Sequence, residues 1–436
     1  MDTFHRPATR RLGLAASLAL VAGLLVALAA PAGAASPKTP GRFTGFAFDT
    51  CVAPSNQVMD AWRMTSPFSV VGIYTSGRAR ACPESAQPNL SPAWVKRQAD
   101  RGWRFLPIHV GYQAPCFSGK KSRMSSDVRT ARQQARVDAD EAAAAARRYG
   151  FGAKNVLYLD IEYYNRGNRA CNEATLQFID AWNERVAKRG YRAGLYSSGA
   201  AAIMSVDEAR RTKRKGFTQP YHLWMAWENG RADVSGGKYL ADAGWKGRRI
   251  HQYDLDTKAS YGGATVNIDR NFLQTGGGSR ATRAKKACGV PLNQSRYKSL
   301  RKGNRNTQVK LLRCLLRREG LVKSVSSSYS SATARAVNTY RRSKGWSANG
   351  RVSSTVWAAL LAEGSTGGVL KYGSTGEKVW RAQRALKAGG ANVSVNGFFD
   401  ARTAVAVKRY RQKNGLPGYQ TLEASVWRKL QAGRRS

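Results

Sequence analysis

Residues 155–162 read NVLYLDIE, a short aliphatic and aromatic run that ends in two carboxylates. Runs of this length, rich in Val, Leu, Ile and Tyr, are typical of buried β-strands. Seven further runs of the same kind alternate with helical stretches across residues 42–273, and they begin at Phe43, Ser69, Arg104, Arg192, Tyr221, Arg249 and Ala264. Eight strands that alternate with helices predict an α/β fold, a (β/α)₈ TIM-like barrel. The last two connections are short, so we expect irregularity there.

The last third of the chain follows a different pattern, in which residues recur at a period of 70. Pairs separated by 70 include Leu300 and Leu370, Thr333 and Thr403, Tyr340 and Tyr410, and Trp357 and Trp427. Each unit carries amphipathic stretches of helical period, which predicts two small three-helix all-α modules after the barrel. The expected organisation is a barrel over 40–274, a linker over 275–287, and modules over 288–364 and 367–433.

The chain is strongly basic, with 72 Lys and Arg against 27 Asp and Glu and a formal net charge of +45. The residues from 276 onward hold 33 of these cations and only five acids. Such an excess indicates a polyanionic partner, and composition alone leaves nucleic acid, a membrane surface and an anionic cell wall open. Location has to decide among them.

The N-terminus predicts export. Arginines precede an apolar run over 12–30, which ends in small residues. This pattern is typical of a secretory signal peptide over 1–35, with cleavage after Ala34 or Ala35. An uncleaved membrane anchor is the alternative, and an arginine pair before the run leaves the export route open. No other stretch is apolar enough to span a bilayer, so no stable membrane span is expected after cleavage.

Export makes the six cysteines candidates for disulfides. Six cysteines allow 15 pairings, and none of them stands in a CxxC motif. Four of them lie just beyond successive predicted strands, and two lie at the start of the first module. This layout favours pairing Cys51 with Cys82, Cys116 with Cys171, and Cys288 with Cys314.

Four acids fall at predicted strand ends: Asp49, Asp160, Glu162 and Asp269. In a (β/α)₈ barrel this face carries the reactive groups, and side chains two apart on a strand share a face. Two carboxylates in one cleft suit glycoside hydrolysis, which needs a protonated acid and an ionised partner. The structural alternative is that Asp160 and Asp269 cap loops or pair with an arginine such as Arg270.

Aromatic and amide side chains at or near the strand ends are candidates for stacking on sugar rings and for hydrogen bonding to them. They are Tyr74, Tyr112, Tyr163, Tyr196, Trp224, Trp227, Gln252, Tyr253 and Asn271. Packing in the barrel core is the alternative for Trp224. His109, His222 and His251 show no spacing that argues for a metal. No metal and no cofactor are expected.

Six stretches carry a resemblance along most of the barrel: GFAFDTC (45–51), YLDIEYY (158–164), GLYSS (194–198), LWMAWEN (223–229), HQYD (251–254) and IDRNF (268–272). The barrel resembles the Rv2525c-like glycoside-hydrolase-like domain (the DUF1906 group) and, more distantly, the family 25 lysozymes. The resemblance implies that Glu162 is the general acid, Asp160 its orienting neighbour, and Asp49 and Asp269 two further acids. The first strand departs by ending in Asp-Thr-Cys instead of Asp-Val-Ser.

The repeat units resemble the type-one peptidoglycan-binding domain. The second unit matches well, with GSTGEKVWRAQRAL from Gly373 and NGFFDARTAVAVKRYRQKNGL from Asn396. The first unit departs at SSSYSSATARAV from Ser326, and Arg313 replaces the helix glutamine. The resemblance implies that the second unit binds peptidoglycan, and the departures put the ligand groove of the first in doubt.

These observations predict a secreted, extracellular, cell-wall-associated glycan hydrolase. Its expected substrate is peptidoglycan or another wall polysaccharide, cleaved by carboxylate acid catalysis, with the modules as anchors and anionic wall polymers as further partners. The alternative is a non-catalytic wall protein that binds glycan through a hydrolase-like barrel. Nucleic acid is not an expected partner, because none of its recognition motifs is present.

Overall fold

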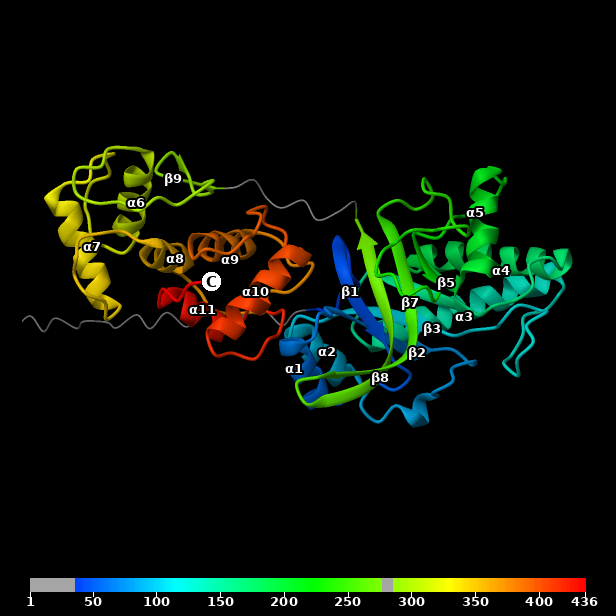
Figure 1. The fold of residues 1–436 in the computed structure, drawn as a ribbon. Coiled ribbons are helices and arrows are strands. Elements are labelled where there is room, and N and C mark those ends of the chain that lie inside the picture. The colour runs from blue at the N-terminus through cyan, green and yellow to red at the C-terminus, as the bar shows by residue number, and fades with distance from the viewer. Residues whose placement is uncertain (1–35, 277–284) are drawn as a thin grey trace, which may run out of the picture. The chain divides into compact units, whose positions relative to one another are not determined.

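The computed structural model describes residues 36–276 and 285–436. The predicted signal peptide and most of the predicted linker therefore lie outside the described residues. Eight strands close into a barrel in sequence order, as predicted. They are β1 (Phe43–Asp49), β2 (Val70–Ser76), β3 (Arg104–His109), β4 (Val156–Ile161), β5 (Arg192–Ser198), β6 (His222–Ala226), β7 (Arg248–Tyr261) and β8 (Ala264–Thr275) (Figure 1).

Helices follow the first five strands and cover the outside of the barrel. They are α1 (Asn56–Thr65), α2 (Pro92–Asp100), α3 (Val128–Arg148), α4 (Arg169–Lys188) and α5 (Met204–Arg211), with short helical turns η1 (Glu84–Ala86) and η2 (Gly199–Ile203). Side-chain oxygens of Ser55, Ser91, Asp127 and Asn168 cap four of these helices by accepting from backbone N–H groups. In the described chain no helix separates β6 from β7 or β7 from β8, which is the predicted irregularity.

Strand β8 runs antiparallel to both of its neighbours, β7 and β1. The tip of the β7–β8 hairpin pairs Tyr261 with Ala264, and Gly262 and Gly263 between them have φ of +58° and +79°. A two-residue turn reverses the chain, whereas a parallel return needs a crossover of a dozen or more residues. The expectation that Asp269 closes its strand is therefore wrong, because β8 continues to Thr275.

The barrel has an apolar interior and an apolar outer layer. Leu106, Ile108 and Trp224 belong to the inner cluster of buried side chains. Phe105, one residue from Leu106, belongs to the larger cluster between the strands and the helices. This alternation follows from the period of two in a strand, and it fixes which strand-end residues face the barrel axis.

Three disulfides join the cysteines in the predicted pairs: Cys51 with Cys82, Cys116 with Cys171, and Cys288 with Cys314. The first two connect segments that follow β1, β2, β3 and β4. Each therefore ties together loops on the rim of the barrel that carries the strand-end carboxylates. Cross-links of this kind limit the conformations open to the unfolded loops.

The repeat appears in the structure as two sets of three helices after the short strands β9 (Lys286–Ala287) and β10 (Val290–Pro291). The sets are α6 (Thr307–Arg318), α7 (Ser331–Ser343) and α8 (Ser354–Ala362), then α9 (Glu377–Ala388), α10 (Ala401–Lys413) and α11 (Ala424–Gln431). Corresponding helices begin 70 residues apart, and so do the isolated bridges Leu300 to Val352 and Leu370 to Leu422. The predicted helical modules are confirmed.

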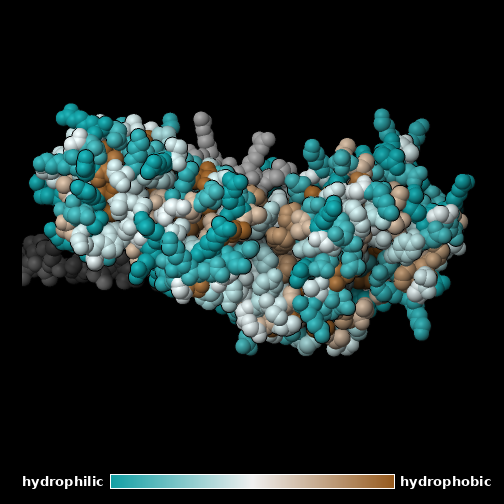
Figure 2. Space-filling model, viewed as in Figure 1, coloured by the Kyte–Doolittle hydropathy of each residue, from teal (hydrophilic) through white to brown (hydrophobic). Residues whose placement is uncertain are grey.

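The described helices are amphipathic or short, and none has both the length and the apolar character required to cross a membrane. On the face drawn in Figure 2, hydrophilic side chains predominate, and hydrophobic residues appear in small groups.

Gln383 in α9 organises a loop of the second module. Its buried amide donates to Asn396 Oδ1, Phe398 O and Thr403 Oγ1 at 2.9, 2.8 and 3.0 Å, and accepts from the N–H groups of Asn396 and Gly397 at 3.0 and 2.8 Å. In the first module Arg313 occupies the equivalent position and donates to Thr333 Oγ1 and Ser324 O. The exchange of glutamine for arginine thus preserves a structural contact.

We expect Gln383→Ala to lower the free energy of unfolding by about 2 kcal/mol, because it leaves two backbone N–H groups of the loop unpaired. Hydrogen exchange followed by mass spectrometry on the full chain should show faster exchange around residues 394–400. Gln412→Ala, an exposed position in α10, is the matched control and should leave this exchange unchanged. Equal protection in both variants would contradict the structural role.

Candidate functional site

The carboxylate of Asp49 lies at the end of β1, where it is only 1% exposed. It receives hydrogen bonds from three neutral side chains. Asn271 Nδ2 donates to its Oδ1 at 2.6 Å, Tyr74 OH donates to its Oδ2 at 3.2 Å, and Gln252 Nε2 lies 3.3 Å from Oδ1. No cation among the described residues pairs with it. The site therefore holds this acid by neutral donors alone.

Burial raises the pKa of Asp49 to about 7, and the charge of Asp269 adds to the shift, while the three donors oppose it. Asp269 lies opposite Asp49 in the β1–β8 register. Burial also raises the pKa of Asp269, although the backbone N–H of Asp256 opposes the shift by donating to its Oδ1 at 2.8 Å. Gln252 Nε2 also donates to Asp269 Oδ2 at 3.3 Å, so one amide joins the two acids.

Asp160 on β4 is 5% exposed, and its Oδ1 has no hydrogen-bond partner among the described residues. Burial raises its pKa well above the usual value, and the charge of Glu162 raises it further, whereas Lys121 acts in the opposite direction. Gln113 fixes the backbone of this segment by donating to Asp160 O at 3.1 Å and accepting from Glu162 N at 2.7 Å. The strand end is therefore held rigidly.

Glu162 follows β4 and is the exposed member of the group, with 38% of its side chain accessible. Lys121 Nζ lies 2.5 Å from its Oε1 and forms an ion pair with it. Together, Asp49, Asp160, Glu162 and Asp269 form what we call the carboxylate cluster. Asp49 and Asp160 are buried and Asp269 is half-buried, and the pKa values of all three are raised, whereas Glu162 is charge-paired and partly exposed.

Lys121 and Gln113 did not emerge from the sequence. Gln113 lies just after the third strand, where the loops of a barrel carry functional residues, and this position could have identified it as a site residue. Lys121 lies in an irregular loop, and only the folded path of that loop brings it to Glu162. The disulfide from Cys116 to Cys171 ties this loop to the start of α4.

Three of the predicted sugar-binding residues donate hydrogen bonds to the carboxylate cluster: Tyr74, Gln252 and Asn271. A fourth, Tyr196, reaches it through Gln252. Tyr196 OH donates to Gln252 Oε1 at 2.7 Å, which orients the amide toward Asp49 and Asp269. Burial and the neighbouring carboxylates raise the pKa of Tyr74 and Tyr196 well above that of a free phenol. Both phenols therefore stay protonated and serve as donors.

Trp224 is buried in the inner barrel cluster, and its Nε1 donates to Asn271 Oδ1 at 2.7 Å. The indole thus orients the amide that holds Asp49. Its ring packs edge-on against Tyr158 and Tyr196, so the inner core of the barrel holds Trp224 in place. This is the core position that the sequence left open as an alternative.

Of the other four predicted aromatics, three contact residues outside the carboxylate cluster. Tyr112 OH accepts from Arg78, whose guanidinium lies 4.1 Å from the ring. Trp227 packs edge-on against Tyr239. Tyr253 is buried beside His251. Tyr163 is 57% exposed, and it is the member of this group that remains open to a ligand.

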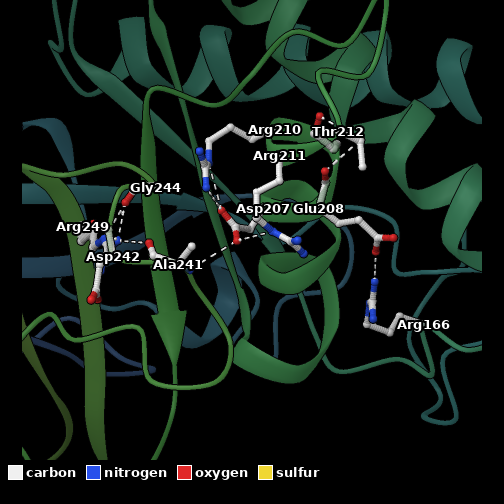
Figure 3. A network of polar contacts seen from close by, with 11 residues as sticks. Arg166, Asp207, Glu208, Arg210, Arg211, Thr212, Ala241, Asp242, Gly244 and Arg249 are labelled. Carbon is white, nitrogen blue, oxygen red and sulfur yellow. Dashed lines mark hydrogen bonds and ion pairs between the residues drawn. The ribbon is translucent and has the colours of Figure 1, made fainter.

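Arg270 pairs with Asp254 at 3.3 Å, and no ion pair with Asp160 or Asp269 is formed among the described residues. A separate polar network joins α5 to the segment before β7 (Figure 3). There Asp207 contacts Arg210 and Arg211 at 2.7 and 3.2 Å, and Arg249 donates to the carbonyls of Ala241, Asp242 and Gly244. Its charges are satisfied internally, so it stabilises the fold.

Two of the three predicted strand-end histidines are committed to structural contacts. His222 Nδ1 lies 2.8 Å from Tyr158 OH, and burial lowers its pKa to about 3. Both ring nitrogens of His251 lie within 2.9 Å of backbone carbonyls, those of Asp233 and Trp227. Both ring nitrogens of His251 are therefore occupied, and His222 is held through its Nδ1.

The closed barrel carries its carboxylate cluster at the ends of β1 and β4 and within β8. Residues 60–273 match the family model described as "Rv2525c-like, glycoside hydrolase-like domain". The match covers slightly less than half of the chain and spans β2 to β8, with Asp160, Glu162 and Asp269. The predicted resemblance of the barrel is thereby confirmed.

Solved structures are similar to parts of the chain. An uncharacterized B. stearothermophilus protein is 19% identical, with 52% of this chain and 94% of that chain covered and a TM-score of 0.35. A family 25 glycosyl hydrolase from Bacillus anthracis is 14% identical, with 55% and 94% covered and a TM-score of 0.34. A peptidoglycan-binding protein from Clostridioides difficile is 33% identical over 15% of this chain and 42% of that chain, with a TM-score of 0.15. No curated protein matches the sequence.

The raised pKa of Asp49 predicts a pH dependence of stability. The native carboxyl keeps its proton up to a pH of about 7, whereas an unfolded aspartate loses it near 3.8. Between these values unfolding releases a proton, so the free energy of unfolding falls as pH rises, by at most about 1.4 kcal/mol per pH unit. Urea unfolding of Asp49→Asn should therefore show a smaller fall between pH 4.5 and 7 than wild type. An identical fall in both proteins would contradict the buried proton.

Proposed function

We propose that the protein is a secreted cell-wall glycan hydrolase that cleaves glycosidic bonds of peptidoglycan at the carboxylate cluster. The observation that carries this proposal is the electrostatic division within the cluster. Burial raises the pKa of Asp49 to about 7 and that of Asp160 well above its usual value, while Glu162 is ion-paired and the side chain of Glu162 is 38% accessible. A glycosidase needs both kinds of group beside the bond that it cleaves.

Glu162 is the group proposed to protonate the leaving oxygen, because it is the accessible member of the cluster. The ion pair with Lys121 has to open for this step, because Lys121 Nζ occupies Glu162 Oε1. Asp160, whose Oδ1 has no hydrogen-bond partner among the described residues and whose pKa is raised by burial, is the adjacent acid. Asp49 and Asp269 are proposed to stabilise the positive charge that develops on the sugar once they ionise.

The test is incubation of the purified full chain with insoluble peptidoglycan and mass spectrometry of the soluble products. Wild type should release fragments with new reducing ends, and Glu162→Gln and Asp160→Asn should each lower the rate at least 100-fold. Asp254→Asn, which removes the carboxylate paired with Arg270, is the matched control and should remain active. Full activity of Glu162→Gln would remove that residue from the mechanism.

Lys121→Met distinguishes two roles of the lysine. If the ion pair restrains the acid, the variant should hydrolyse peptidoglycan several-fold faster, because Glu162 Oε1 no longer has to leave the lysine to reach the substrate. If Lys121 instead positions Glu162, the variant should be slower. The rate of product release by the variant relative to wild type, measured with excess peptidoglycan, separates the two outcomes.

The ion pair between Lys121 and Glu162 also supports a second candidate function. A barrel whose accessible acid is neutralised by a lysine can bind a glycan without cleaving it. Co-sedimentation of the chain with peptidoglycan, without soluble products from wild type or Lys121→Met, would favour this non-catalytic binding protein.

The second helical module is proposed to anchor the protein to the wall. A surface hollow beside α10 is lined by Arg402, Arg409 and Lys413 together with apolar Val405. Three cations around an apolar floor suit a peptide that bears carboxylates. At the positions 70 residues earlier, the first module has Ala332, Thr339 and Ser343 instead of the cations. The second module is therefore the proposed binder.

Truncation after Gly276 should release the barrel from sedimented cell walls, because it removes 33 of the 72 cations and both modules. In the full chain, Arg402→Ala with Arg409→Ala should reduce wall binding at least tenfold. Arg335→Ala with Arg342→Ala, on the corresponding helix of the first module, is the control of equal charge loss. Equal losses in the two double variants would indicate retention by net charge alone, which also weakens with salt.

A further inference from the structure

A second group of chemically reactive side chains lies outside the carboxylate cluster, between β3 and α3. It consists of His109 at the end of β3, and of Asp138 and Glu141, which lie one turn apart on α3. Leu106 and Ile108 face the barrel interior, so His109 faces the helical layer, where it meets Asp138. The carboxylate cluster and this group are therefore on opposite sides of the strand layer.

The imidazole of His109 presents a free nitrogen to this group. The residue is 1% exposed, and its Nδ1 lies 2.8 Å from Ser76 Oγ. Its Nε2 has no hydrogen-bond partner among the described residues. A proton on Nδ1, which the serine oxygen can accept, leaves the lone pair on Nε2. This is the arrangement by which proteins fix a metal-binding histidine.

The distances suit a small divalent cation. Nε2 of His109 lies 3.5 Å from Asp138 Oδ2, and the candidate atoms of all three residues lie within 4.8 Å of one another. Ligands of a tetrahedral zinc ion at 2.0–2.2 Å are separated by roughly 3.4 Å. Glu141 is exposed, so its side chain can turn to close the remaining gap.

The surrounding groups hold the ligands and leave a net negative charge. Arg78 contacts Asp138 Oδ1 at 3.3 Å, and the backbone N–H of Tyr112 donates to Oδ2 at 3.0 Å. Glu141 Oε1 accepts from the N–H of Gly77 at 2.9 Å. The two carboxylates thus have one arginine beside them. Arg78 contacts Oδ1 of Asp138, whereas Oδ2 is the oxygen nearer to His109.

Gly111 keeps the space beside the two buried ligands free. A Cβ atom there would lie 2.0 Å from Asp138 Oδ2 and 2.9 Å from His109 Nε2. Any other residue would displace the pair. We propose that His109, Asp138 and Glu141 bind one divalent transition-metal ion of the zinc type, which ties the end of β3 to α3. One imidazole and two carboxylates are a donor set that such ions accept.

The test uses the untagged full chain, stripped with EDTA, desalted, and titrated with zinc chloride by isothermal calorimetry. We expect one zinc ion per chain and at least tenfold weaker binding by Glu141→Gln. Glu141 is exposed, so this variant should fold even where a substitution of buried His109 does not. Asp140→Asn, the neighbouring carboxylate that pairs with Arg185 and Arg189, is the matched control and should bind zinc as wild type does.

Zinc-edge anomalous scattering from crystals grown with zinc locates the ion. A peak between the three side chains is the expected result. A peak at the carboxylate cluster alone, equal affinity of wild type and Glu141→Gln, or no binding by wild type would each overturn the proposal. In those cases the group is a buried imidazole and carboxylate pair that serves the fold only.

Discussion

The site depends on the removal of Asp49 from water without a cation to compensate for it. An isolated buried carboxylate is costly when ionised, so burial raises the pKa of Asp49 to about 7, and neutral donors surround the group. Asn271 is oriented by Trp224, and Gln252 by Tyr196. The side-chain amides of Asn271 and Gln252 thus connect aromatic residues of the barrel to the carboxylate of Asp49.

The antiparallel direction of β8 makes this arrangement possible. It places Asp269 opposite Asp49 and sets Asn271 two residues further along the same strand. The sequence identified the run, its acid and its amide, and the short connection indicated an irregularity. It did not reveal the reversal, because an apolar alternating run looks the same in either direction. The pair Gly262 and Gly263 was the local signal for a hairpin.

Strands, helices, disulfide pairs and repeats were predictable, because each leaves a periodic or spatially ordered trace in the chain. The contact between Lys121 and Glu162 was not, because it depends on the path of an irregular loop that carries no periodicity. Arg313 shows the opposite case. Its departure from the repeat puts the ligand groove of the first module in doubt, and this stays a prediction. The folded module uses Arg313 to hold the loop that corresponds to the one held by Gln383.

The net positive charge of the chain acts against the raised pKa values of the buried carboxyl groups. A formal charge of +45 favours the ionised form of every carboxyl group in the protein, and it acts strongly where screening is weak. The raised pKa values of Asp49 and Asp160 therefore have to come from local burial, which opposes the field of the whole molecule. Glu162, outside the buried region, is the acid that a lysine reaches. In this basic chain, the pKa of Asp49 is therefore raised only because burial outweighs the positive charge of the rest of the protein.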